Sequence, residues 1–223
     1  MIHESYFWKK ELYNDFITIS KIRQNKRIYE KSFVKLERAL MMGAFIIRKL
    51  DEAQKIPPDF LYRQETLEFF VNKGEIVDHM NWHKIDEHYY LSTRTKQTRN
   101  WKYILNQLIH SFTLVYVFDD DNKLDGIFIN TDNTKKDALL YLPIKLILTI
   151  FLSISEGSIV KTNSSRDIIG KDENGDFLYG EMKLRDAVYA YPDGFKLDNI
   201  ICDALNGLIY KKQNNIALTI KTE

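Results

Sequence analysis

The residues best suited to chemistry lie on a helix predicted over residues 98–112. His110 supplies an imidazole that titrates near neutral pH and can act as a general acid or base. At about 100° per residue, it shares one helix face with Arg99, Tyr103 and Asn106. The opposite face already offers an apolar surface, formed by Trp101, Ile104, Leu105, Leu108, Ile109 and Phe112. We therefore expect the His110 ring to face solvent, a partner or a functional site.

The stretch Leu105–Phe112 also carries a family resemblance. It resembles the signature helix of the HEPN superfamily, helical-bundle domains that include many metal-independent RNA endonucleases of toxin–antitoxin and phage-defence systems. The family pattern is an arginine, a polar residue, three further residues and a histidine, on a helix that faces a dimer cleft. Asn106 matches the polar position and His110 the histidine, whereas Leu105 stands where the family has its arginine. The resemblance implies an RNA-cleaving dimer or a degenerate member that does not cleave.

The chemistry that this resemblance implies needs no metal and no cofactor. His110 would transfer a proton while an RNA 2′-hydroxyl attacks the adjacent phosphate, and Asn106 would hold the substrate or the imidazole. Because leucine cannot orient a phosphate or stabilise its charge, another cation would have to do so. Arg99, Lys102 and Tyr103 are the substrate-binding candidates, and Arg99 would reach His110 only across a dimer. The alternative for these residues is an ordinary solvated helix face.

A second set of residues could hold a metal ion. If the segment is helical, His79, His83 and Glu87 share one face at a spacing of four residues. Two imidazoles and a carboxylate suit zinc or iron. The alternative is a group of structural or surface histidines, which also includes His88.

Only the local distribution of charge, and not the total charge, favours a particular kind of partner. The chain has 32 Lys+Arg and 31 Asp+Glu, a net charge of +1, so its total charge does not favour a polyanionic partner. Basic residues are nevertheless concentrated at 21–38 and 94–102, and these segments could line a phosphate-binding surface or form solvated helix faces.

The elements that would position these residues are mostly helices. Apolar spacing predicts helices over 4–24, 31–54 and 98–112, a short one between Asp59 and Gly74, and a last one over 197–212. The run 138–155 reads as a buried central helix with a polar stripe, rather than a membrane span. Hairpins are predicted at 113–131 and at 167–183, where Asn174-Gly175 suits the turn.

The predicted fold class is therefore mainly α: a helical bundle with one or two small β-hairpin elements. We expect one domain over 1–223, with a hairpin insertion near 113–131 and a looser α/β lobe from about residue 157. A hydrophobic content of 44% excludes a disordered chain, and the single cysteine, Cys202, excludes a disulfide-stapled domain. No signal segment is visible, so we expect a cytoplasmic protein without a membrane partner.

Three functions remain open at this point. The first is a HEPN-like protein that binds or cleaves RNA as a homodimer, in which case it could be an endoribonuclease. The second is a non-catalytic interaction or accessory protein with a protein partner. The third is a metal-dependent hydrolase centred on His79 and His83.

Overall fold

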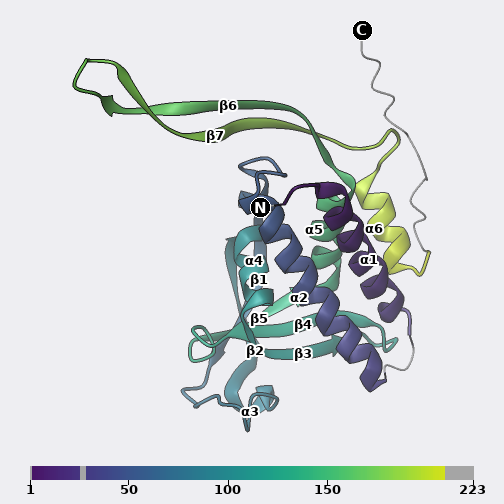
Figure 1. Ribbon diagram of the computed structural model, residues 1–223. Coiled ribbons are helices and arrows are strands. Elements are labelled where there is room, and N and C mark those ends of the chain that lie inside the picture. Colours follow the sequence, from purple (N-terminus) through teal and green to yellow (C-terminus); the bar gives the residue numbers. More distant parts are fainter. Residues whose placement is uncertain (1, 26–28, 209–223) are drawn as a thin grey trace.

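A five-stranded antiparallel sheet forms the centre of the molecule (Figure 1). The computed structural model describes residues 2–25 and 29–208. It is 39% helix and 35% strand, so the prediction of a mainly α fold is wrong. The strand order in the sheet is β2-β1-β5-β4-β3. Their bounds are β1 Gln64–Asn72, β2 Tyr89–Asn100, β3 Ser111–Phe118, β4 Leu124–Thr131 and β5 Ala138–Pro143.

Strands β1 and β5 are the elements that overturn the helical prediction. Leu140 and Leu142 of β5 pack under the helices, whereas Leu139 packs on the opposite face of the sheet. A strand buried on both faces reads as a continuous apolar run, which periodicity cannot distinguish from a buried helix. The same holds for Phe69 and Phe70 of β1, which belong to different faces.

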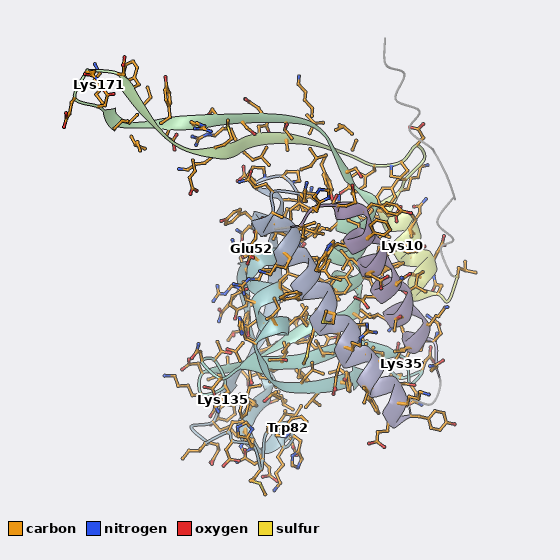
Figure 2. The ribbon with its side chains drawn as sticks, viewed as in Figure 1. Lys10, Lys35, Glu52, Trp82, Lys135 and Lys171 are labelled. Atoms are coloured by element: carbon orange, nitrogen blue, oxygen red, sulfur yellow. The ribbon has the colours of Figure 1, made fainter. Side chains whose placement is uncertain are left out.

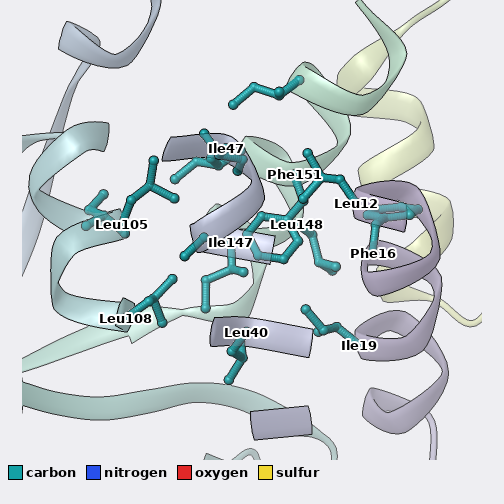
Figure 3. Packing of buried hydrophobic residues seen from close by; sticks show 14 of the residues in the cluster. Leu12, Phe16, Ile19, Leu40, Ile47, Leu105, Leu108, Ile147, Leu148 and Phe151 are labelled. Atoms are coloured by element: carbon teal, nitrogen blue, oxygen red, sulfur yellow. The ribbon is translucent and has the colours of Figure 1, made fainter. Parts of the chain in front are cut away.

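Helices cover one face of the sheet, and the buried helix α5 (Ile144–Glu156) lies at the centre of this layer. Around it lie α1 (Ser5–Arg23), α2 (Glu30–Glu52), α4 (Trp101–Ile109) and α6 (Leu197–Leu205). Side chains from α1, α2, α4 and α5 interdigitate in this core (Figure 3). The first two predicted helices are confirmed. The last one ends at Leu205, and its predicted residues 209–212 lie outside the described residues.

Helix α5 is shorter than the predicted helix because Pro143 ends β5 and precedes its first turn. Proline has no backbone N–H, which is tolerated at a helix start. Among the described residues, no helix combines the length and the apolar character needed to cross a membrane.

The opposite face of the sheet is covered by the segment between β1 and β2. This segment includes α3 (Ile85–His88) and packs Val77 against Phe70, Tyr89 and Leu139. The 3-10 turn η1 (Phe60–Tyr62) precedes β1 on the helical side, where Phe60 and Leu61 are buried.

A long two-stranded ribbon stands away from this body (Figure 1). It consists of β6 (Ser158–Lys171) and β7 (Phe177–Ala190), joined by a turn in which Gly175 has φ +87°. The second predicted hairpin is therefore confirmed, with strands longer than expected. At its root, the Tyr189 hydroxyl donates to the Ile154 carbonyl at 2.9 Å, which ties the ribbon to α5.

Candidate functional site

Helix α4 holds fewer of the predicted site residues than expected. Its N-cap is Asn100, whose side chain accepts from the Tyr103 N–H at 2.9 Å, and its C-cap is His110. Arg99 precedes the helix. It belongs to strand β2, where its backbone lies opposite that of Glu65 in β1. The predicted helix face of Arg99, Tyr103, Asn106 and His110 is therefore divided between a strand, a helix and a cap.

Lys102 and Asn106 line one small pocket, of about 130 Å³, beside α2. Lys102 Nζ lies 3.6 Å from Asp51 Oδ2, and Arg48 Nε donates to Glu52 Oε1 at 3.0 Å. Partial burial raises the pKa of the Asp51 carboxyl above its usual value, and the Lys102 charge opposes that rise. Each cation in this pocket already has an acidic partner, so a phosphate would have to displace one.

Arg99 and Tyr103 line a second pocket, of about 200 Å³, between α4 and the sheet. The Arg99 guanidinium lies 5.3 Å from the centre of the Tyr103 ring and 5.6 Å from that of Phe69. Burial raises the pKa of the Tyr103 hydroxyl, and a hydrogen bond with Arg99 opposes that rise. Asp137 and the buried Gln107 also line this pocket, beside the Arg99 guanidinium.

His110 joins neither pocket. Its side chain is exposed at the end of α4, and it is not among the residues that line the two pockets. The structure thus brings together Lys102 with Asn106, and Arg99 with Tyr103, on two sides of α4.

The predicted metal ligands do not share a helix face, because residues 79–83 form turns and α3 has only four residues. The His79 ring packs on Phe112 with centroids 4.9 Å apart, and the His83 ring contacts Trp82 at 5.7 Å. Glu87 pairs with Lys84. Within residues 2–25 and 29–208, no group of three His, Cys, Asp or Glu residues is placed to hold a metal ion.

Several cations of the two basic segments have acidic partners. Arg23 lies 3.5 Å from Asp119, and Arg94 NH1 contacts both carboxylate oxygens of Glu68 at 3.0 Å. These carboxylates partly neutralise the charges of Arg23 and Arg94. Residues 26–28 of the first segment lie outside the described residues.

An exposed apolar surface on the distal half of the ribbon was not predicted from the sequence. Cross-strand pairs join Arg166 to Met182, Ile168 to Tyr179 and Lys171 to Phe177. Arg166 and Ile168, like Phe177 and Tyr179, are two apart on their strands and so share a face. Met182 and Lys171 are each three residues from the next of these positions, and a register shift at each of these two places accounts for the extra residue, so the three pairs lie on one face of the ribbon. We call its large apolar residues the ribbon apolar face: Ile168, Phe177, Tyr179 and Met182, all of which are exposed. The apolar residues around the predicted turn were the signal that could have revealed it.

A second apolar surface lies between α1 and α2, which we call the α1–α2 groove. It encloses about 260 Å³ and is lined by Phe7, Trp8, Glu11, Asp15, Arg38, Met42 and Ile46. Phe7 is 65% exposed at its rim, and Met41 and Phe45 extend the apolar surface along α2. Burial raises the pKa of the Asp15 carboxyl to about 7, and the Arg38 charge limits that rise.

The root of the ribbon forms a fourth pocket, of about 580 Å³, which is more polar than the α1–α2 groove. The buried Lys9 of α1 donates to the Gly157 carbonyl at 2.7 Å and lies 5.1 Å from the centre of the Tyr189 ring. A Cβ on Gly157 would overlap the Tyr189 ring, so glycine is required at this close approach. These contacts fix the direction in which the ribbon leaves the body.

Searches with protein-family models, against curated proteins and against solved structures give no match for this chain. The resemblance to the HEPN superfamily consequently stays a prediction.

Proposed function

We propose that this protein is an interaction module whose β6–β7 ribbon binds a protein surface. The observation that supports this proposal is the ribbon apolar face, four large side chains on a projection that no part of the described body covers (Figure 1). A two-stranded hairpin is marginally stable in water, and exposed apolar strands with open edges favour pairing with other chains. A partner protein that covers the ribbon removes these apolar side chains from water.

The charge of the ribbon favours protein over nucleic acid. Residues 158–190 contain five basic and six acidic residues, and the turn 172–176 contains three acids and no base. Binding to a phosphate backbone draws its affinity from clustered Lys and Arg. In the middle of the ribbon, Lys183 and Arg185 both pair with Asp167, which removes two of the five cations from this role.

A shortened ribbon tests the proposal. The variant deletes 164–185 and joins the remaining strands, which still pair at Thr162–Ala187, through an Asn-Gly turn. Immobilised wild type and variant are compared for proteins retained from an extract of the source cells, with nuclease present. We expect at least one protein to be retained by the wild type and lost with the short ribbon, while the melting temperature stays unchanged. Identical retained proteins would contradict the proposal.

RNA binding or cleavage through His110 and Asn106 remains a separate prediction. It requires a cation beside the exposed His110 ring, and the two cations predicted for this role, Arg99 and Lys102, line pockets that His110 does not line. Incubation of wild type and His110→Ala with total RNA tests it. Cleavage by the wild type alone would support the prediction of cleavage, and equal cleavage or none from both would remove that part of it.

A further inference from the structure

The ribbon apolar face and the α1–α2 groove are two exposed apolar surfaces of one chain, and they lie on different parts of it. The groove belongs to the helical layer, whereas the ribbon apolar face lies on the distal half of the projection (Figures 1 and 2). Lys171 marks the end of the ribbon in Figure 2, far from Lys10 on α1 and Lys35 on α2. The ribbon cannot fold back on its own groove without breaking the contacts of Lys9 and Tyr189 at its root.

We propose that a second copy of this chain covers both surfaces, with the ribbon of each protomer lying in the α1–α2 groove of the other. This inference rests on the proposed function and names its partner. A reciprocal contact of this kind is two-fold symmetric and therefore closes as a dimer. One type of contact thus removes both apolar surfaces from water.

Charge complementarity supports this pairing. Helices α1 and α2 contain nine basic and six acidic residues, among them the exposed Lys10, Lys35 and Arg38. The ribbon turn carries Asp172, Glu173 and Asp176 without a base among them. The groove lining itself holds Glu11 and Asp15 beside Arg38, so the charge that complements the acidic turn comes from the exposed Lys10 and Lys35 of the same two helices, which favours the encounter.

The available area also suits a stable dimer. Large side chains bury about 150–250 Å² when fully covered, so a half-exposed one still offers on the order of 100 Å². Four such residues on the ribbon and four along the helices (Phe7, Met41, Met42 and Phe45) give roughly 800 Å² for one contact. Two-fold symmetry doubles this to about 1,600 Å², which is the size of a standard specific interface.

Three methionine-to-glutamate variants test the contact. Met182 lies on the ribbon apolar face and is 52% exposed, Met42 lines the groove and is 41% exposed, and Met80 is 83% exposed in the segment between β1 and β2. Sedimentation velocity is measured from about 1 to 100 µM. We expect a wild-type dimer, an increase in the dimer Kd of at least about 100-fold for Met182→Glu and for Met42→Glu, and no change for Met80→Glu.

Mixing the two defective variants distinguishes this geometry from other dimers. A mixture of Met42→Glu and Met182→Glu contains one intact ribbon and one intact groove, so it should form a heterodimer with one undamaged contact. A dimer held by ribbon against ribbon, or by groove against groove, gains nothing from mixing. We expect the mixture to associate at least about tenfold more tightly than either variant alone.

Each remaining result overturns the inference. These results are a monomeric wild type at 100 µM, a dimer unaffected by Met42→Glu or Met182→Glu, a dimer equally weakened by Met80→Glu, and a mixture without recovery. A monomer that still loses a bound protein when the ribbon is shortened would remove only the second copy as partner. A monomer whose retained proteins do not depend on the ribbon would remove the proposed function as well.

Discussion

At the scale of single residues, Asp15 is the group whose ionisation depends most clearly on its surroundings. It lies in the α1–α2 groove among apolar side chains, with Glu11 and Arg38 as charged neighbours. Burial raises its pKa from 3.8 to about 7. Because the folded pKa lies above the unfolded one, the folded state binds the proton more tightly. The contribution of Asp15 to stability is therefore greatest below about pH 4, falls as the pH rises to about 7, and stays reduced above that.

Replacing Asp15 by Asn should remove this loss, because the amide does not ionise. We expect Asp15→Asn to raise the free energy of unfolding by roughly 2 kcal/mol at pH 8 and by much less at pH 4. Urea unfolding at the two pH values measures the difference. Glu11→Gln, one helical turn earlier on an exposed position, is the matched control. An equal effect of Asp15→Asn at both pH values would contradict the assignment.

Asn130 shows what a buried polar side chain does in this sheet. Its Nδ2 donates to the Tyr89 hydroxyl at 2.8 Å, and its Oδ1 accepts from the Thr113 N–H at 3.2 Å. The Tyr89 hydroxyl in turn donates to the Lys135 carbonyl at 2.8 Å, and burial raises the pKa of this hydroxyl to about 12. Asn130 thus joins strands β2, β3 and β4 with the loop that leads to β5.

Asn130→Ala should leave the buried Thr113 N–H without an acceptor. We expect a loss of about 2–4 kcal/mol in the free energy of unfolding, measured by urea denaturation. Asn163→Ala, on the exposed ribbon, changes the same side chain and should cost less than about 0.5 kcal/mol. Equal losses from the two substitutions would show that the buried network contributes nothing.

At the scale of elements, the contact between α2 and α5 depends on one glycine. A Cβ built on Gly43 would overlap the ring of Phe151, which is fully buried. The two helices can therefore approach closely at this point because residue 43 has no side chain. Elsewhere in a helix, glycine would cost stability relative to alanine.

Gly43→Ala should consequently destabilise the protein although alanine favours helix formation. We expect a loss of at least about 2 kcal/mol from overpacking. Combined with Phe151→Leu, the same substitution should cost less than it does alone, which a double-mutant cycle measures. Strict additivity of the two substitutions would indicate that residue 43 and the ring do not meet.

The same scale shows what the sequence could and could not predict. Helices α1 and α2 each have one solvent-exposed face and one buried face, so the spacing of their apolar residues identifies them as helices. Strand β5 is buried on both sides, and a run of apolar residues then predicts burial without saying which element is buried. The exposure of His110 could be predicted from the apolar residues on the opposite face of its helix. The separation of Arg99 and Tyr103 from Lys102 and Asn106 could not. That separation arises because strand β2 continues to Asn100 and takes Arg99 off the helix.

At the scale of the whole molecule, the body and the ribbon differ in what holds them together. The body has a continuous core, whereas the ribbon beyond its root has cross-strand contacts only. Local opening is easiest where few apolar side chains are buried.

Limited trypsin digestion should therefore cut the ribbon first. Among the sites within residues 29–208, we expect the earliest cleavage after Lys171, Lys183 or Arg185, leaving 29–157 intact. Intact-mass measurement over time identifies the order. In the proposed dimer, the ribbon of the wild type should be cut at least about tenfold more slowly than that of Met182→Glu at the same high concentration. An earliest cut inside the five-stranded sheet would contradict this division.

The position of β5 has a consequence for how the protein folds during its synthesis. Strands β1 and β2 form one antiparallel pair and β3 and β4 another, and in the described sheet the strand that pairs with both is β5, which lies between β1 and β4. It is also the last of the five strands to leave the ribosome. During synthesis, the two strand pairs therefore cannot join into one sheet until β5, which ends at Pro143, has been made. Until then, the edges of β1 and β4 that β5 covers stay unpaired. We expect nascent chains that stop before β5 to depend on chaperones until that strand inserts between them.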